Sequence, residues 1–413
     1  MNTPPTLSRL ERETATHPVA VAARMFAARA TSLVDSFHML VLPLNETLQK
    51  AEDELEHLLS LYSDPGEREL LEVSPHSMPL TKQTAYIRAR QKRDDAHFAH
   101  DILPRALLLA LVAYYDYFLR EHIQALYSIR PELRSSLQVS YTIPELIEFN
   151  SVDAAVQYGI ERHLDSVLRE SHLAQIKWLE RLLDMKLTDV PVLPQFLELT
   201  ERRNLIAHCG GIVNSHYVSR CKSFGAAPGG EVGEALIIDQ RYFEQSFNVV
   251  FELTVKLSQS TWRKVRPDEM ALADHVLRSI TYTLLVLERF DLARATLEFA
   301  HALKKHSSDH FSRIFTVNLA QCYKWLGDIH KCHEVMKTKD WTATEDSFIL
   351  ADRVLHDDFA EARRLMVRTA SNGVIPEAAF RDWPLFREFR KSHYFQEAYM
   401  EVYGRPFAPG PFR

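Results

Sequence analysis

Glycine is scarce in this chain, with only 12 among 413 residues. Strand-type alternation of polar and apolar residues is also hard to find. Leu, Ala, Glu, Arg and Gln instead recur at helical spacings along the chain. We therefore expect an all-α fold. Because the chain is longer than the length at which a single core stops growing, we expect two or more compact units.

Cysteine is rare too, and the four cysteines form no CxxC pair and no dense framework. This usage suits a reducing compartment and predicts free thiols. Cys322, His330, Cys332 and His333 lie close together in the sequence and could suggest zinc. However, the adjacent Cys332 and His333 point about 100° apart on a helix, and no second CxxC arm exists. We predict no metal and no cofactor.

No overall basic field exists, since the formal net charge is −6. Over residues 266–413, 21 Lys and Arg balance 21 Asp and Glu, so the whole acidic excess lies in residues 1–265. Any contact with nucleic acid must therefore be local, because sequence-independent affinity needs clustered cations.

A signal peptide and long apolar runs are also lacking. The start, MNTPPTLSRLERETATHP, carries prolines and acidic residues where a signal peptide needs an apolar run. No continuous apolar run reaches the length of about 18 residues that is typical of a membrane-spanning helix. We therefore expect a soluble, cytoplasmic protein with no membrane segment.

Residues 1–265 carry long amphipathic patterns typical of a helical bundle. The most apolar segment, ALLLALVAYYDYFLREHI, belongs to a predicted helix over 82–129 and should lie at the bundle centre. Helices are predicted over 19–62 with an interruption at Pro43, from near Glu145, over 152–187 with a break near Ser171, over 195–209 before Gly210-Gly211, and over 241–262. Residues 214–239 are not clearly helical. Arg266-Pro267 is the best candidate domain boundary, which divides the chain into 1–265 and 266–413.

Beyond Arg266 the pattern changes to short helices in pairs. Asp291, Asp328 and Asp358 lie at predicted helix junctions. Their spacing averages close to the period of about 34 residues in tetratricopeptide repeats. The segment 319–328, LAQCYKWLGD, also resembles the end of that family's first helix. We predict an α-α repeat module, with an irregular helical cap as the alternative.

The segment ERRNLIAHCGG, residues 201–211, contains the most informative motif. It resembles the motif of HEPN ribonucleases, in which a histidine follows an arginine after four to six residues, the first of them polar. The bare spacing is weak, because six other pairs fit it: Arg12/His17, Arg90/His97, Arg93/His100, Arg202/His208, Arg294/His301 and Arg387/His393.

Three features distinguish Arg203 and His208 from the other pairs. Among the seven pairs, asparagine follows the arginine only at Asn204. The motif lies late in a predicted bundle, and Gly210-Gly211-Ile212-Val213-Asn214 resembles the turn after the motif in HEPN proteins of defence and toxin systems. The family often has asparagine directly after the histidine, where this chain has Cys209.

The positions of the motif residues around a helix give a test that does not depend on the family resemblance. Phe196, Leu199, Arg203 and Ile206 form one packing stripe, in which Arg203 takes the place of an apolar residue. A buried guanidinium needs a partner, which could be a carboxylate, a substrate phosphate or a second subunit. Asp116, the acid within the long apolar helix, could be that carboxylate, although a surface position is an open alternative.

The resemblance implies a HEPN bundle, spanning roughly residues 20–262, that cleaves RNA at a composite site in a homodimer. His208 would act in general acid/base catalysis, Arg203 would hold the phosphate, and Asn204 would orient His208 or the scissile group. Arg202 is expected to be solvated or to steer phosphate. The implied role is a toxin or phage-defence effector, with the C-terminal repeats sensing a ligand or protein. The alternative is a non-catalytic adaptor that binds RNA or protein.

Overall fold

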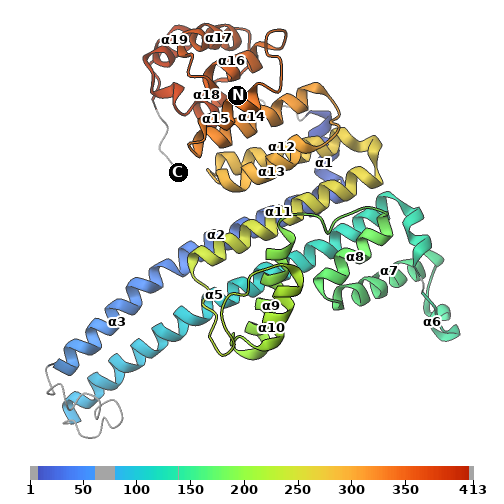
Figure 1. Ribbon diagram of the computed structural model, residues 1–413, viewed down its shortest axis with the longest axis vertical. Helices are drawn as coiled ribbons and strands as arrows, with labels where there is room; N and C mark the ends of the chain where they lie inside the picture. Colours follow the sequence, from blue (N-terminus) through green and yellow to red (C-terminus); the bar gives the residue numbers. More distant parts are fainter. Residues whose placement is uncertain (1–7, 61–79, 138, 409–413) are drawn as a thin grey trace. The chain divides into compact units, whose positions relative to one another are not determined.

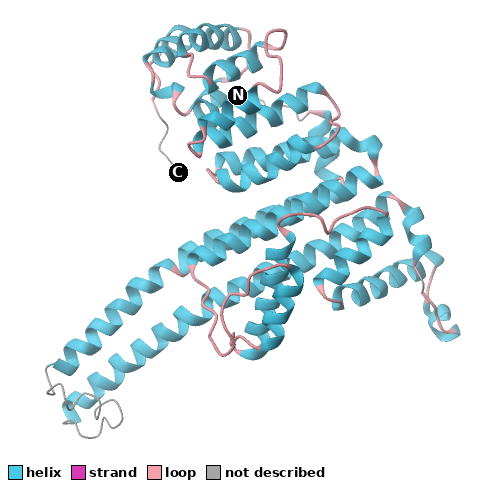
Figure 2. Cartoon of the chain, viewed as in Figure 1, coloured by secondary structure: helices cyan, strands magenta, loops and turns pink. Residues whose placement is uncertain are grey.

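The computed structural model describes residues 8–60, 80–137 and 139–408 (Figure 1). The fold is all-α, as predicted, and the described residues form no β-strand (Figure 2). Their only strand-like pairing is an isolated bridge between Ile212 and Ala235.

The chain divides into two compact units. The first, here the motif unit, comprises residues 25–124 and 133–254. The second, here the hairpin unit, comprises residues 1–24, 125–132 and 255–413. The domain boundary expected at Arg266-Pro267 stays a prediction.

The helices predicted before Arg266 are present. They are α2 (Pro18–Leu40), α3 (Leu42–Ser60), α5 (Leu80–Ile129), α6 (Ile143–Glu148), α7 (Val152–Arg169), α8 (His172–Leu183), α9 (Leu193–Cys209) and α11 (Gln240–Val265). Two further helices, α1 (Arg9–Thr16) and α10 (Ser215–Phe224), were not predicted. The break expected near Pro43 falls at Val41, and Ser171 caps α8 with its side chain. Residues 61 and 62 of the first predicted helix lie outside the described residues.

Helix α10 corrects the expectation that residues 214–239 are not helical. The Asn214 side chain accepts a hydrogen bond from the backbone N–H of Tyr217 at 2.9 Å, which caps the start of the helix. Gly225 ends it with a left-handed φ of 74°. Tyr217 and Cys221, one turn apart, bury their side chains beside Leu205. Short amphipathic helices of this kind leave a weak periodic signal in the sequence.

The core of the motif unit surrounds α5, as its apolar sequence predicted. The ring centroid of Phe118 lies 5.5 Å from that of Phe26 in α2. Tyr115 packs against Phe196 of α9, with ring centroids 4.6 Å apart. Phe26 also approaches Phe251 of α11, at 6.1 Å. Burial of each such side chain stabilises the fold by roughly 1.5–3 kcal/mol.

By length and composition alone, one helix in the described part of the chain could cross a membrane: the segment Gln83–Ile129 of α5. The core helix of a soluble protein can meet the same criterion. The expected cytoplasmic location therefore stays a prediction.

The hairpin unit consists mainly of short helices that pack in sequence. They are α12 (Met270–Val286), α13 (Phe290–Ala302), α14 (Asp309–Trp325), α15 (Ile329–Met336), α16 (Asp346–Leu355), α17 (Phe359–Ser371), α18 (Glu377–Asp382) and α19 (His393–Tyr403). Helices α12 and α13, α14 and α15, and α16 and α17 form three pairs whose members contact each other. Two junctions fall at the predicted Asp328 and Asp358, whereas the first ends at Arg289, two residues before the predicted Asp291.

The three pairs share one turn conformation. Glu288, Gly327 and Asp357 take left-handed φ values of 54°, 87° and 59°, each one residue before the N-cap of the second helix. The backbone N–H of the next residue, Arg289, Asp328 or Asp358, donates in every case to the carbonyl five residues earlier. Asp328 and Asp358 are thus equivalent N-caps, whereas Asp291 lies in the first turn of α13. The turn is therefore repeated, although its residues differ: Leu326-Gly327 in one pair, Leu287-Glu288 and His356-Asp357 in the others.

Candidate functional site

Helix α9 carries the motif and ends directly after it. Pro194 lies in its first turn, and the buried Phe196 and Leu199 hold it in the motif unit. Gly210 takes a left-handed φ of 62°, and the N–H of Gly211 donates to the carbonyl of Leu205 at 3.0 Å. His208 therefore lies in the last helical turn, as the glycine pair predicted.

Arg203 faces α5 and approaches Asp116. Its Nη2 lies 3.9 Å from Oδ2 of Asp116, and Oδ1 of Asp116 lies 2.9 Å from Nε2 of the buried His172 in α8. The sequence left two possibilities for Asp116, a position beside Arg203 or one on the helix surface. In the structure Asp116 lies beside Arg203. The pair is loose, because 3.9 Å exceeds a hydrogen-bond length. Nε of Arg203 is buried with no hydrogen-bond partner among the described residues.

Asn204 and His208 lie on the exposed side of α9. They are four residues apart and so share one face of the helix. In the described part of the chain, neither side chain makes a hydrogen bond or ion pair. Arg203 points about 100° away from Asn204 around the helix axis. The structure thus brings Asn204 and His208 together and leaves Arg203 at the neighbouring edge, beside α5.

Arg105 of α5 is a cation at this site that sequence reasoning missed. Its Nη1 donates to the carbonyl of Gly210 at 3.0 Å, and its Nη2 pairs with Asp101 at 2.8 Å. A cation at the end of a helix complements the negative pole of the helix dipole. Arg105 and Gly210 are 105 residues apart in the sequence, and no local pattern connects them.

Arg202 corrects a prediction, because it is buried rather than solvated. Its Nε donates to Glu198 at 2.8 Å, and its guanidinium carbon lies 3.7 Å from the centre of the Tyr242 ring. Only 7% of its side chain is exposed. The reason is that this face of α9 packs against α11 and the loop after α10, so Arg202 cannot steer phosphate at the surface.

Glu198 is the centre of a satisfied polar network. It accepts hydrogen bonds from Arg202, Tyr217 and Tyr242. Burial and the Glu198 carboxylate raise the pKa of both tyrosines. A cavity of about 350 Å³ borders Glu198, Arg202 and Tyr242. Because the partners of Glu198 are already in place, we regard this network as structural. In the sequence, only the i, i+4 spacing of Glu198 and Arg202 could have indicated that these two side chains pair.

The four cysteines are free thiols. Burial raises the pKa of Cys221 to about 11 and that of Cys332 to about 11. No three His, Cys, Asp or Glu side chains of the described segments lie close enough to hold a metal ion. The groups at the end of α9 that could act on a substrate are the guanidinium of Arg203, the amide of Asn204 and the imidazole of His208.

Comparisons of this chain with protein-family models, with curated proteins and with solved structures found no match, so its function has to be inferred from these residues.

Proposed function

We propose that this chain is a metal-independent endoribonuclease of the HEPN type, acting as a toxin or anti-phage effector. The observation that supports it most is the combination on α9 of an exposed histidine, an exposed asparagine and a partly exposed arginine. The Arg203 side chain is 29% exposed and its pair with Asp116 is longer than a hydrogen bond, so its Nη groups can bind an anion such as a phosphodiester.

The reaction needs one base, one acid and one cation. A base removes the proton of a ribose 2′-OH, and the 2′-oxygen attacks the adjacent phosphorus. The bond from phosphorus to the 5′-oxygen breaks, and an acid protonates that oxygen. Arg203 stabilises the extra charge on the phosphoryl oxygens. The products are a 2′,3′-cyclic phosphate and a 5′-hydroxyl end.

A single His208 cannot easily supply both the base and the acid. Two copies of α9 that face each other in a homodimer would supply two histidines. A surface on α5 supports this arrangement, because Phe98, Ile102 and Tyr117 are exposed by 67%, 43% and 42%. They lie on one face with the small or partly exposed Ala106, Leu109 and Ala113. The same helix supplies Arg105 and Asp116, so this apolar stripe lies beside the motif.

The test is RNA cleavage with EDTA present, using His208→Ala and the matched control His216→Ala. His216 is an exposed histidine of α10, so it controls for the loss of a surface imidazole. We expect wild type and His216→Ala to leave 2′,3′-cyclic phosphate ends, and His208→Ala to lose at least about 100-fold in rate. Equal cleavage by His208→Ala would show that the assigned site is wrong.

The adaptor alternative has its own support in α6 and the start of α7. Ile143, Ile147 and Val152 are exposed by 74%, 78% and 80%, which suits a protein-binding patch. If no RNA is cut under any condition, this alternative is favoured.

A further inference from the structure

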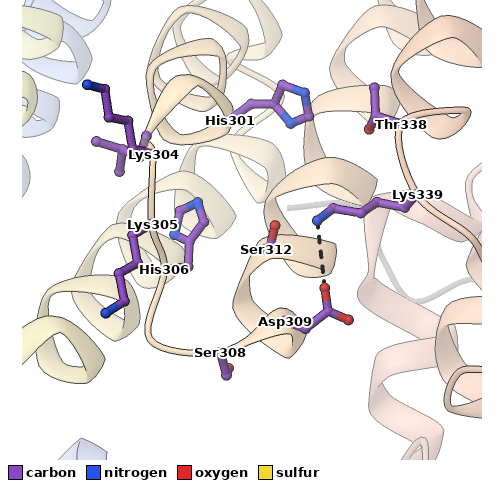
Figure 3. Close-up of a pocket in the computed structure, with 10 residues that line it drawn as sticks. His301, Lys304, Lys305, His306, Ser308, Asp309, Ser312, Thr338 and Lys339 are labelled. Atoms are coloured by element: carbon purple, nitrogen blue, oxygen red, sulfur yellow. Dashed lines mark ion pairs between the residues drawn. The ribbon is translucent and has the colours of Figure 1, made fainter.

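An open cleft of about 460 Å³ lies in the hairpin unit, where the loop after α13 leads into α14 (Figure 3). Its walls come from the end of α13, the loop, the start of α14 and the segment after α15. Polar side chains make up most of the lining, among them Lys304, Lys305, Lys339, Ser308 and Ser312.

Positive charge dominates this lining. The lining contains three lysines, Lys304, Lys305 and Lys339, and one aspartate, Asp309, which gives a formal charge of +2 with the histidines neutral. Of the three lysines, Lys339 is the one directed at Asp309 (Figure 3). Lys304 and Lys305 are exposed, and neither makes an ion pair or hydrogen bond within the described residues. Asp309 is already shared by two cations, since it lies 3.6 Å from Nζ of Lys339 and 2.5 Å from Nε of Arg313. The two loop lysines are therefore left without an anion among the described residues.

A buried aspartate beneath the cleft fixes the loop that carries these lysines. Asp274 of α12 is fully buried and accepts hydrogen bonds from Arg263 at 2.6 Å, from His306 at 2.9 Å and from the backbone N–H of Ser307 at 2.6 Å. Burial by itself would raise the pKa of Asp274, but the bonds from His306 and Arg263 outweigh it and lower that pKa. The loop is thus held in place without any ligand.

His301, at the end of α13, also lines the cleft. Burial, followed by the charges of Lys339 and His306, lowers the pKa of its imidazole. The hydroxyl groups of Ser308 and Ser312 line the cleft as further hydrogen-bonding groups. The cleft therefore combines cations with hydroxyl groups that can donate to an anion, as phosphate recognition requires.

We propose that this cleft binds a small phosphate-bearing molecule of nucleotide size, with Lys304 and Lys305 contacting the phosphates. A volume of about 460 Å³ falls in the range of small-molecule sites. Residues 266–413 have no net charge, because 21 basic residues match 21 acidic ones. The excess of two positive charges in the cleft lining is therefore local and belongs to no net basic field of residues 266–413, which favours a compact anion over an extended nucleic-acid strand.

The test is calorimetric titration of the full chain with ATP, pyrophosphate, adenosine and a single-stranded RNA. The chain carries His208→Ala, so that the result does not depend on the proposed nuclease. We expect saturable binding of ATP and pyrophosphate, no binding of adenosine, and a loss of about tenfold or more in affinity for K304A/K305A. The matched control is K337A/K391A, which removes two exposed lysines of the same unit that do not line the cleft.

Three results would overturn the proposal. These are no binding of ATP or pyrophosphate by a folded protein, equal affinity of the K304A/K305A and control variants, or binding only of single-stranded RNA that pyrophosphate does not displace. A thermal melt of each variant checks folding. Because Asp274 holds the loop and the two lysines are exposed, we expect K304A/K305A to melt close to wild type.

Discussion

At the scale of single residues, Asp116 links α5 to two other helices of the motif unit. It reaches His172 of α8 with one oxygen and Arg203 of α9 with the other. It is a positioning residue in the proposed reaction, because it would act on RNA only through Arg203.

Substitution of Asp116 by asparagine should therefore slow RNA cleavage while the protein stays folded. The amide keeps a polar group beside His172 but removes the charge that faces Arg203. We expect the cleavage rate to fall by about tenfold, with a loss of about 1–2 kcal/mol in the free energy of unfolding. Cleavage kinetics and urea unfolding measure the two effects. Asp165→Asn, which removes the partner of Arg120, is the control, and a rate unchanged in Asp116→Asn would refute the positioning role.

His122 should make the stability of the motif unit depend on pH. Burial lowers its pKa to about 3, whereas an unfolded histidine titrates near 6.5. The folded state therefore favours the neutral ring, whose stabilising effect is complete above about pH 6.5 and is lost as the pH falls toward 3. Between pH 7 and pH 4.5 the loss should be about 2.5 kcal/mol.

The measurement is urea unfolding of wild type and His122→Leu at both pH values. His122→Leu changes the absolute stability, so the comparison is of the two slopes with pH. We expect the leucine variant to lose about 2.5 kcal/mol less than wild type on acidification. His216→Leu, at an exposed position, should keep the wild-type slope. Parallel curves for wild type and His122→Leu would contradict the prediction.

At the scale of elements, the repeated turn of the hairpin unit contains a measurable strain. Glu288 and Asp357 adopt the left-handed conformation that Gly327 adopts without cost. Glu288→Gly should therefore stabilise the unit by about 1 kcal/mol, because its ion pair with Arg387 is exposed and weak. Gly327→Ala should destabilise it by about 1 kcal/mol.

Thermal and urea unfolding test both changes. Glu334→Gly is the control, since a glycine within α15 should destabilise the helix by about 1 kcal/mol. A glycine at 288 that destabilises the protein as much as one at 334 would show that the turn is not strained.

Local signals determined which elements could be predicted. Ser171 and Gly210 are capping residues, so the helix limits beside them followed from the sequence. The proximity of Asp116 to Arg203 could be anticipated because an acid inside an apolar helix needs a partner. The burial of Arg202 was not predictable in this way, because it depends on Tyr242, which comes from α11. Arg105 was missed because its partner, the carbonyl of Gly210, is also distant in the sequence.

At the scale of the whole molecule, the composite site requires two copies of the chain. Phe98→Asp together with Ile102→Asp would bring two charges to the exposed stripe of α5, where a second copy would bury them. We expect this variant to be monomeric at micromolar concentration in analytical ultracentrifugation and to lose RNA cleavage. Ile147→Asp, at an exposed apolar position on α6, should keep both properties. An active monomer would contradict the composite site.

Asp274 and its hydrogen bonds have a consequence for how this protein could evolve. The aspartate fixes the backbone of the cleft loop from below, while Lys304 and Lys305 project from it without partners among the described residues. The conformation of the loop thus depends on Asp274, whereas the ligand preference of the proposed site depends on the two lysines. Point mutations at the two lysines could change the charge that the cleft accepts while the loop keeps its conformation, so related chains could diverge in their ligands without losing stability.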